Sequence, residues 1–173
     1  MNEWDGHYAT LTQPEAYGDD ASYRLAAEWV KDCQSVEDWG CGKGWLRSMV
    51  DPKAYIGVDG SRTPFADVIA DLTTYRSQCE GLVLRHVLEH SRDWVKILDN
   101  AVASFTKRLC IVLFTPLADQ TTVLRTEPDY GDVPVISFRL TDLLDRLGDE
   151  TVKIRVVGDE TVIRYAKALD VIR

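Results

Sequence analysis

Cysteine pairs, long apolar runs and clusters of basic residues are missing from this 173-residue sequence. Its four cysteines include no CxxC pair, which excludes a zinc ribbon and disfavours a small disulfide framework. We interpret them as reduced, buried, small apolar side chains: Cys33, Cys41, Cys79 and Cys110. No apolar run approaches the ~20 residues of a membrane span. No basic segment leads into an apolar one at the N-terminus, so we predict no signal peptide, no membrane partner and a cytoplasmic location.

The charge balance is acidic. Lysine and arginine number 20 against 28 aspartates and glutamates, which gives a net charge of -8. Proteins that bind nucleic-acid backbones depend largely on clustered basic side chains. The sequence therefore disfavours a nucleic-acid partner, although a mononucleotide or a local basic groove is not excluded. The oligomeric state is left open.

The composition is that of an ordinary globular domain, with 45% apolar and 28% charged residues. The length suits about one domain, and no repeat, low-complexity segment or Pro/Gly/Ser-rich linker marks a boundary. We therefore predict a single domain over residues 1–173, of which residues 1–34 form an N-terminal arm and a helix.

The order of predicted elements defines the fold class. Apolar residues at helical spacing predict helices over residues 20–33, 91–105 and 141–148, the last with Thr141 as N-cap and Gly148 as C-cap. Strands are predicted over residues 35–40, 54–61, 67–72, 81–87 and 108–116, and an antiparallel hairpin over 151–157 and 161–169. The segment from Leu117 to Pro134 has little periodicity, and we predict a long loop near the site. The result is a three-layer α/β domain.

Three glycines at alternate positions follow the first predicted strand, in the segment DWGCGKG (residues 38–44). Gly40, Gly42 and Gly44 lack β-carbons, so backbone amides can approach a ligand and φ can be positive. Ligands of such sheets bind at the carboxyl ends of the strands. Asp59 comes nineteen residues after Gly40, where an acid is placed to hold ribose hydroxyls. The pattern therefore predicts a nucleotide-like cofactor at this turn.

The glycine spacing separates two cofactor classes. The dinucleotide fingerprint is GxGxxG, but here the third glycine comes one residue early and bulky Trp45 fills the fingerprint position. The spacing DxGxGxG, Asp38 to Gly44, resembles the first motif of class I S-adenosylmethionine-dependent methyltransferases. In that family the loop receives the amino-acid end of the cofactor.

The resemblance runs from about Val36 to Leu169. YIGVDGS and ADL resemble the second and third motifs, EGLVLRHVLEH the fourth and VLFTP the fifth strand, and FRLTDLLDRLG with the closing hairpin resembles the end of the family's fold. HVLEH recurs in a small-molecule branch related to the ubiquinone and menaquinone enzymes. The resemblance implies a Rossmann-like seven-stranded sheet, mostly parallel with an antiparallel last strand. It implies these cofactor-binding residues: Asp38, Gly40, Cys41, Gly42, Gly44, Asp59, Gly60, Asp71, Leu72 and Arg85.

Two departures from the family pattern are visible. Only eleven residues separate Asp59 from Asp71, so we predict that the usual helix between strands two and three is reduced to a turn around Pro64. Glu80 stands where the family commonly has aspartate at the start of strand four.

The HVLEH segment permits two interpretations. It fits the HxxEH pattern of inverted zinc peptidases, but that site requires one helix, and His86 here follows a buried apolar strand. We therefore predict no metal. His86 lies at a strand end facing the expected position of the transferred methyl group, so we identify it as the candidate catalytic base, the alternative being a packing role. We expect His90 to be structural, hydrogen-bonded in the turn before the helix.

The N-terminal arm is unusually rich in aromatic and polar side chains, including His7 and Tyr8. In related enzymes such an arm folds over the pocket, so Tyr17 and Arg24 are candidates to reach the cofactor's carboxylate. We interpret four tryptophans as core or pocket wall: Trp29, Trp39, Trp45 and Trp94.

The resemblance implies S-adenosylmethionine as cofactor and methyl transfer to a small-molecule acceptor at oxygen or nitrogen. Three alternatives stay open. One is a non-catalytic S-adenosylmethionine-binding regulator or complex subunit. Another is a nicotinamide-dependent oxidoreductase, which the third glycine disfavours. The last is a methyltransferase acting on a glycan, a nucleotide or a nucleic acid.

Overall fold

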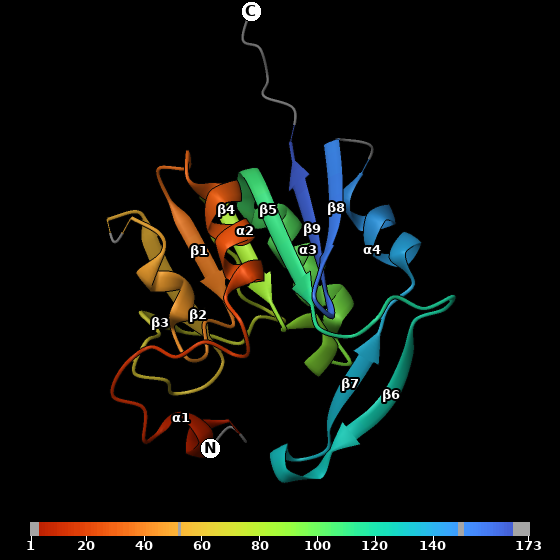
Figure 1. Cartoon of the computed structure of the whole chain (residues 1–173), viewed down its shortest axis with the longest axis horizontal. Coiled ribbons are helices and arrows are strands. Elements are labelled where there is room, and N and C mark those ends of the chain that lie inside the picture. Colours follow the sequence, from red (N-terminus) through yellow and green to blue (C-terminus); the bar gives the residue numbers. More distant parts are fainter. Residues whose placement is uncertain (1–3, 52, 149–150, 168–173) are drawn as a thin grey trace, which may run out of the picture.

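The computed structural model describes residues 4–51, 53–148 and 151–167. Within them, seven strands form one sheet in the order β3-β2-β1-β4-β5-β9-β8 (Figure 1). The strands are β1 (Val36–Trp39), β2 (Tyr55–Asp59), β3 (Val68–Ile69), β4 (Cys79–Arg85), β5 (Phe105–Leu113), β8 (Thr151–Val157) and β9 (Glu160–Ala166). The neighbours from β3 to β5 are parallel, and β9 runs antiparallel to both β5 and β8. The predicted seven-stranded Rossmann-like sheet is confirmed.

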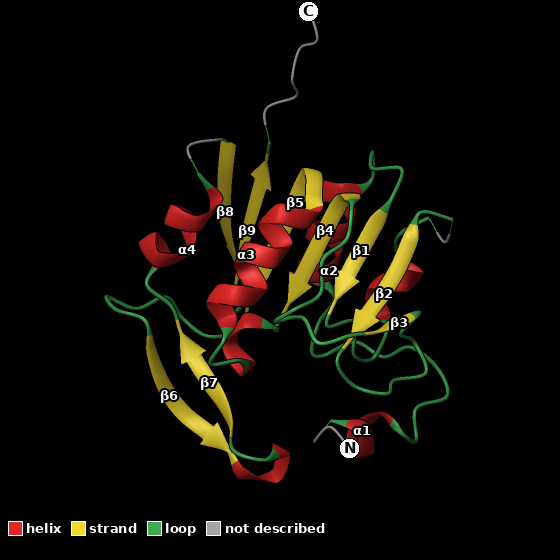
Figure 2. Ribbon diagram, turned by 180° about the vertical axis from the view of Figure 1, so that it is seen from behind, coloured by secondary structure: helices red, strands yellow, loops and turns green. Residues whose placement is uncertain are grey.

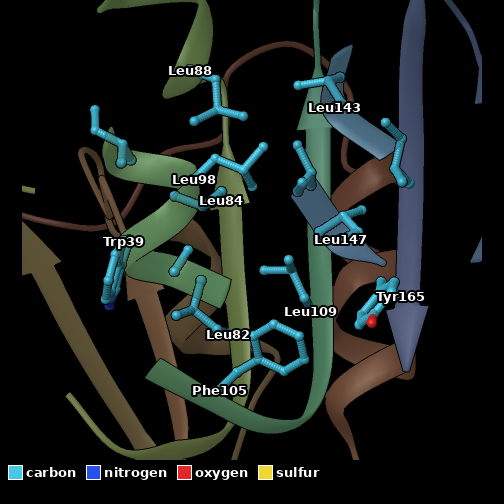
Figure 3. Close-up of a cluster of buried hydrophobic side chains, with 14 of the residues drawn as sticks. Trp39, Leu82, Leu84, Leu88, Leu98, Phe105, Leu109, Leu143, Leu147 and Tyr165 are labelled. Atoms are coloured by element: carbon cyan, nitrogen blue, oxygen red, sulfur yellow. The ribbon is translucent and has the colours of Figure 1, made fainter. Parts of the chain in front are cut away.

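Helices cover both faces of the sheet and make three layers. Helix α2 (Ala21–Val30) lies on one face, and α3 (Trp94–Ser104) and α4 (Leu140–Leu147) lie on the other (Figures 1 and 2). Leucines of β4 and β5 pack under α3 and α4 in the larger core cluster (Figure 3). Val83 and Cys110 face α2 in the smaller one. Because both faces are covered, β4 and the end of β5 read as continuous apolar runs.

The connection after β1 is short. The glycine turn leads into a 3-10 helix, η1 (Trp45–Ser48), whose N-cap is Gly44 at φ +72°. No α-helix stands between β1 and β2 within the described residues. The connection from β2 to β3 is a turn around Pro64, as predicted, and its Thr63 hydroxyl donates to the Gly42 carbonyl at 2.6 Å. The turn therefore supports the glycine loop from the side.

The prediction of a long loop over Leu117–Pro134 is wrong. The segment contains β6 (Thr122–Glu127), the 3-10 helix η3 (Pro128–Tyr130) and the start of β7 (Val133–Ser137), which pair as an antiparallel hairpin. The hairpin projects beyond the carboxyl ends of the parallel strands (Figure 2). Residues 122–126 of β6 are all exposed. A strand with no buried face shows no alternation of apolar and polar residues, so its sequence resembles a loop.

The predicted cap of α4 is also wrong. The helix begins at Leu140, its N-cap is Arg139, and Thr141 lies inside the first turn. The Thr121 hydroxyl binds the start of the helix instead: it accepts from the Arg139 amide at 3.1 Å and donates to Asp142 at 2.7 Å. Gly148 is the C-cap, as predicted, at φ +82°. The closing hairpin is confirmed through Ala166, whereas residues 168 and 169 of the predicted strand lie outside the described residues.

All four cysteines are buried and unpaired, as predicted. In the part of the chain that the structure describes, no helix has the length and apolarity needed to cross a membrane.

Candidate functional site

A cavity of about 550 Å³ lies at the carboxyl ends of the parallel strands. The strand order reverses between β1 and β4, where open α/β sheets bind their ligands. One half of the cavity belongs to the β1 turn and the end of β2. The other half belongs to the ends of β4 and β5, the 3-10 helix η2 (Leu88–His90), the β6–β7 hairpin and the arm. The lining includes Asp38, Gly40, Cys41, Gly42, Asp59, Ser61, Arg85, His86, His90 and Phe114.

Positive φ angles and close packing shape the glycine turn. Gly40 has φ +75°, and a β-carbon there would lie 2.4 Å from a methyl of Val87. The Gly42 amide donates to Asp59 Oδ2 at 2.9 Å, and the Ser61 amide donates to Oδ1 at 2.8 Å. Asp59 is 7% exposed, and burial raises its pKa. Its carboxylate therefore joins the glycine turn to the end of β2 and faces the cavity.

Asp38 lies beneath the turn. The Tyr55 hydroxyl donates to its Oδ2 at 2.7 Å. Burial raises the pKa of Asp38 to about 7, against the opposing effect of the Tyr55 hydrogen bond. Its carboxyl group thus titrates near neutral pH at the floor of the cavity.

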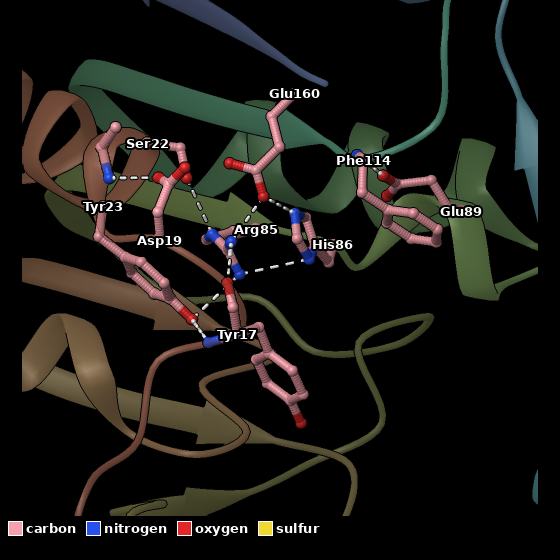
Figure 4. Close-up of polar contacts among 10 residues, drawn as sticks. Tyr17, Asp19, Ser22, Tyr23, Arg85, His86, Glu89, Phe114 and Glu160 are labelled. Atoms are coloured by element: carbon pink, nitrogen blue, oxygen red, sulfur yellow. Dashed lines mark hydrogen bonds and ion pairs between the residues drawn. The ribbon is translucent and has the colours of Figure 1, made fainter. Parts of the chain in front are cut away.

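Arg85, at the end of β4, joins four parts of the chain (Figure 4). Its guanidinium donates to Ser22 Oγ and Tyr23 Oη of α2 at 3.1 and 3.0 Å, and to the Tyr17 carbonyl of the arm at 3.1 Å. It also donates to Glu160 Oε1 at the start of β9, at 2.6 Å. The predicted cofactor residue is therefore a junction whose donors are largely occupied by protein groups.

His86 faces charged neighbours through both ring nitrogens. Its Nδ1 lies 3.2 Å from Arg85 Nη1, and its Nε2 lies 2.6 Å from Glu160 Oε1 (Figure 4). Since a guanidinium only donates, Nδ1 accepts, and the ring proton is on Nε2 toward the carboxylate. Burial lowers the pKa of His86, and Glu160 opposes that effect. The backbone of His86 is held at φ +57°, which few non-glycine residues adopt. Its role as a base stays a prediction.

His90 is the imidazole that sequence reasoning placed outside the site. Its backbone amide donates to the Val87 carbonyl within the turn, whereas its side-chain Nδ1 lies 3.2 Å from the carbonyl of Pro134 in β7, and its ring lines the cavity. The carbonyl accepts, so Nδ1 carries the proton and Nε2 keeps a lone pair. No residue of the described ranges hydrogen-bonds Nε2. Burial lowers the pKa of His90, which favours the neutral ring.

The arm covers the cavity through aromatic side chains. Tyr8, in the short helix α1 (Asp5–Tyr8), lies over the glycine turn, so that a β-carbon on Gly42 would be 3.1 Å from its hydroxyl oxygen. The Tyr17 hydroxyl donates to that of Tyr8 at 3.3 Å. Trp4 stacks on Tyr130 of η3, with ring centroids 4.2 Å apart. Tyr17 lines the cavity, and its contact with the cofactor's carboxylate stays a prediction. The sequence reading missed Trp4, although its place beside His7 and Tyr8 was a visible signal.

Several predicted cofactor residues do not line the cavity: Gly44, Gly60, Asp71, Leu72 and Arg24. Arg24 is an exposed side chain paired with Asp20 at 2.6 Å, because it lies on the solvent side of α2. Asp71 caps its own turn by accepting from the Thr73 amide at 2.8 Å. Leu72 is buried in the core. The four tryptophans interpreted as core or pocket wall belong to the core: Trp39 is fully buried, and Trp29, Trp45 and Trp94 pack against the buried clusters.

HVLEH does not lie on one helix. His86 follows β4, whereas Glu89 and His90 belong to η2. Among residues 4–51, 53–148 and 151–167, no three His, Cys, Asp or Glu side chains form a group that could hold a metal ion. The helical geometry of the zinc-peptidase interpretation is therefore missing.

No family model and no curated protein matches the chain. Solved methyltransferase structures do share its fold. The 1,6-didemethyltoxoflavin-N1-methyltransferase of Burkholderia thailandensis, with bound 1,6-didemethyltoxoflavin and S-adenosylhomocysteine, has a TM-score of 0.68 at 16% identity, over 86% of this chain and 79% of that one. The magnesium protoporphyrin IX methyltransferase of Synechocystis, with bound S-adenosylmethionine, has a TM-score of 0.60 at 11% identity, over 94% and 90%. An Archaeoglobus fulgidus methyltransferase has a TM-score of 0.60 at 18% identity, over 86% and 92%. The chain thus has the fold of these proteins.

Proposed function

We propose that this chain is an S-adenosylmethionine-dependent methyltransferase that acts on a small molecule at oxygen or nitrogen. The observation that carries the proposal is the link between the glycine turn and Asp59 at the strand-order switch point. The similar structures support it, because each is described as a methyltransferase and two hold S-adenosylmethionine or its product. Gly42 and Asp59 are the residues that the sequence pattern assigned to such a cofactor.

The half of the cavity formed by the β1 turn and the end of β2, here called the inner half, has residues that fit the cofactor. Each Asp59 oxygen accepts one backbone amide, which leaves lone pairs for ribose hydroxyls. Gly40 and Gly42 present bare backbone to the cavity. When bound, the cofactor supplies an electrophilic methyl group on a sulfonium. Our proposed cofactor-binding set also includes four other residues that line the cavity: Asp38, Cys41, Arg85 and Tyr17. Five residues of the predicted set do not line it, and we assign them only indirect roles: Gly44, Gly60, Asp71, Leu72 and Arg24.

The acceptor is small in our proposal because the cavity is roofed by the arm and the hairpin. A single cavity of about 550 Å³ must hold the cofactor and the acceptor together. For His86 to act as the base, its Nδ1 must first give up the hydrogen bond from Arg85. We therefore keep His86 as a candidate and treat its contact with Glu160 as a positioning interaction.

Thermal unfolding with ligands tests the cofactor. S-adenosylhomocysteine at a hundred times its dissociation constant stabilises by about 2.7 kcal/mol, which raises the midpoint by several degrees. We expect that rise with S-adenosylhomocysteine but not with NADH, and we expect a chelator to cause no fall. Asp59→Ala should abolish the shift, whereas Asp145→Ala, on the exposed face of α4, should keep it.

Two results would contradict the proposal. A rise with NADH alone would favour an oxidoreductase. A rise with S-adenosylhomocysteine in a protein that never consumes S-adenosylmethionine, whatever acceptor is offered, would favour a non-catalytic regulator.

A further inference from the structure

The outer half of the cavity differs in chemistry from the inner half. We define it by six residues: Trp4, His90, Phe114, Arg125, Glu127 and Tyr130. They come from the arm, η2, the end of β5, β6 and η3. Rings dominate this half, and its charged pair, Arg125 and Glu127, is joined at 2.9 Å. The inner half instead offers carboxylates and bare backbone.

The rings form a continuous series. Tyr130 and Trp4 stack with centroids 4.2 Å apart and an interplanar angle of 13°. The Trp4 centroid lies 5.5 Å from that of His90, which lies 5.2 Å from that of Phe114 at 30°. The centroids of Phe114 and His86 are 5.0 Å apart. Aromatic rings prefer stacked or edge-to-face partners at these distances. A wall of this kind favours a flat aromatic ligand over a saturated ring or a sugar.

Among the described residues, no hydrogen bond engages Nε2 of His90, whose ring lines this half of the cavity. His90 Nε2 keeps a lone pair because Nδ1 is committed to the Pro134 carbonyl, which also fixes the orientation of the ring. A neutral imidazole can take a proton from a phenol, whose pKa is near ~10, far more readily than from an aliphatic alcohol.

We propose that the outer half binds a planar aromatic acceptor carrying an ionisable hydroxyl, and that His90 Nε2 receives the hydroxyl proton. This inference rests on the proposed methyl transfer and specifies its substrate class. The aryl oxygen bonds to the methyl carbon of a sulfonium donor as the carbon–sulfur bond breaks, and the electron pair of that bond stays on sulfur. The products are an aryl methyl ether, a thioether and protonated His90.

Titration with matched ring probes tests the ring preference. Calorimetry would compare 2-naphthol with decahydro-2-naphthol, which has the same carbon skeleton and hydroxyl position but is neither flat nor aromatic. We expect 2-naphthol to bind about tenfold more tightly, with or without S-adenosylhomocysteine. Tyr130→Leu should remove most of that preference, whereas the exposed Ile69→Ala on β3 should leave it unchanged. Equal affinities for the two probes would overturn the aromatic acceptor.

A test of His90 as the base requires a variant that keeps the hydrogen bond to the Pro134 carbonyl. In His90→Asn the side-chain amide nitrogen can replace Nδ1 toward Pro134 while nothing replaces Nε2. We expect 2-naphthol to bind within about threefold of the parent protein and the rate of 2-methoxynaphthalene formation to fall about 10²- to 10⁴-fold. His86→Asn serves as the comparison.

The outcomes separate the two proposals. An unchanged rate in His90→Asn, or no methyl ether from 2-naphthol bound beside S-adenosylmethionine, would overturn this inference while the cofactor assignment stands. Loss of rate in His86→Asn alone would return the base to His86. If S-adenosylhomocysteine fails to bind while 2-naphthol still binds more tightly than decahydro-2-naphthol, the proposed function is contradicted and the pocket is an aromatic-binding site only.

Discussion

Glu89 is a buried acid at the centre of HVLEH. It is 0% exposed, its Oε1 accepts from the Phe114 amide at 2.7 Å, and its Oε2 has no hydrogen-bond partner among the described residues. Burial raises its pKa from 4.5 to about 8, against the opposing effect of backbone hydrogen bonds that include the Phe114 amide. At neutral pH the side chain is therefore mostly a neutral acid, which suits a structural link between η2 and β5.

The raised pKa predicts that Glu89 makes stability depend on pH. Below about pH 4.5 the folded and unfolded chains both protonate Glu89, so it adds no pH dependence. Between pH 4.5 and about 8 the unfolded chain ionises first, and stability falls with rising pH by up to about 1.4 kcal/mol per unit. Glu89→Gln keeps an oxygen acceptor for Phe114 and cannot ionise. We expect it to match the parent protein at pH 4.5 and to be more stable by roughly 2–4 kcal/mol at pH 8.

Urea unfolding at pH 4.5, 6.5 and 8 measures this difference. Asp38 titrates in an overlapping range, but it is present in both proteins and cancels in the comparison. Glu28→Gln, on the exposed side of α2, controls for loss of one negative charge. Parallel stability curves for Glu89→Gln and the parent would show that Glu89 is ionised in the folded state.

At the residue scale, sequence reasoning succeeded where local geometry dictates the residue. Glycines at a turn with positive φ and an acid at a strand end are visible in one segment at a time. Glu160 and Tyr130 were missed because their importance arises only when β9 and the hairpin are brought against β4 and the arm. Their own sequence neighbourhoods carry no sign of that contact.

At the element scale, the turn after β1 packs closely against Val87, the N-cap of η2. A β-carbon at Gly40 would meet Val87 Cγ2 at 2.4 Å, and φ +75° would strain any other residue there. The two penalties are of different kinds, since Val87→Ala can relieve the clash but not the backbone strain. Glycine is therefore required at position 40 for two reasons, the positive φ and the space that Val87 occupies.

A double-mutant cycle separates the two penalties. We expect Gly40→Ala to destabilise by about 2–4 kcal/mol, of which about 1–2 kcal/mol is backbone strain. In the Val87→Ala background, Gly40→Ala should cost only the strain. Urea unfolding of the four proteins measures the coupling. Additive effects would mean that the turn already shifts away from Val87, and Gly18→Ala, at φ +72° with open space around it, gives the strain alone for comparison.

Elements were predicted well where they are buried and poorly where they project. Strands β4 and β5 lie between two layers, so their apolar runs were visible. Strand β6 is almost wholly exposed, and only tertiary pairing with β7 makes it a strand. The short η1 was also not predicted, because no helical pattern marks it, and sequence analysis described only a glycine turn after the first strand.

At the scale of the whole molecule, the alternation of strands and helices was enough to predict the layers and the seven strands. The arm and the segment from Leu117 to Pro134 were expected near the site, but neither the hairpin in that segment nor the way it closes on the arm was predicted. That closure depends on Trp4 stacking on Tyr130 and on Arg85 holding the arm to the sheet. Both contacts join segments far apart in sequence, and one sequence shows no pattern for such pairs.

Arg85 couples the stability of the arm to that of the sheet, because its guanidinium binds both. Its side chain is 5% exposed and lies 3.9 Å above the Tyr23 ring while it pairs with Glu160. Arg85→Met keeps apolar bulk but removes every donor, and it leaves Glu160 beside His86 without a guanidinium. Because the partly buried Glu160 carboxylate, 18% exposed, loses its guanidinium partner, we expect a destabilisation of about 3 kcal/mol. Arg155→Met, an exposed cation of β8, should cost little.

Loss of the Arg85 guanidinium should weaken both segments that it binds, the arm and the start of β9. Hydrogen exchange in Arg85→Met should rise both in residues 15–23 of the arm and α2 and in residues 158–162 at the β8–β9 turn, because one side chain holds both. Adding Glu160→Gln should recover part of the lost stability, since it removes the uncompensated carboxylate, but it should not restore protection in the arm, whose bond goes to the Tyr17 carbonyl. Exchange that rises at the β8–β9 turn alone would show that Tyr8 and Trp4 suffice to hold the arm, and that the cavity roof is independent of the sheet.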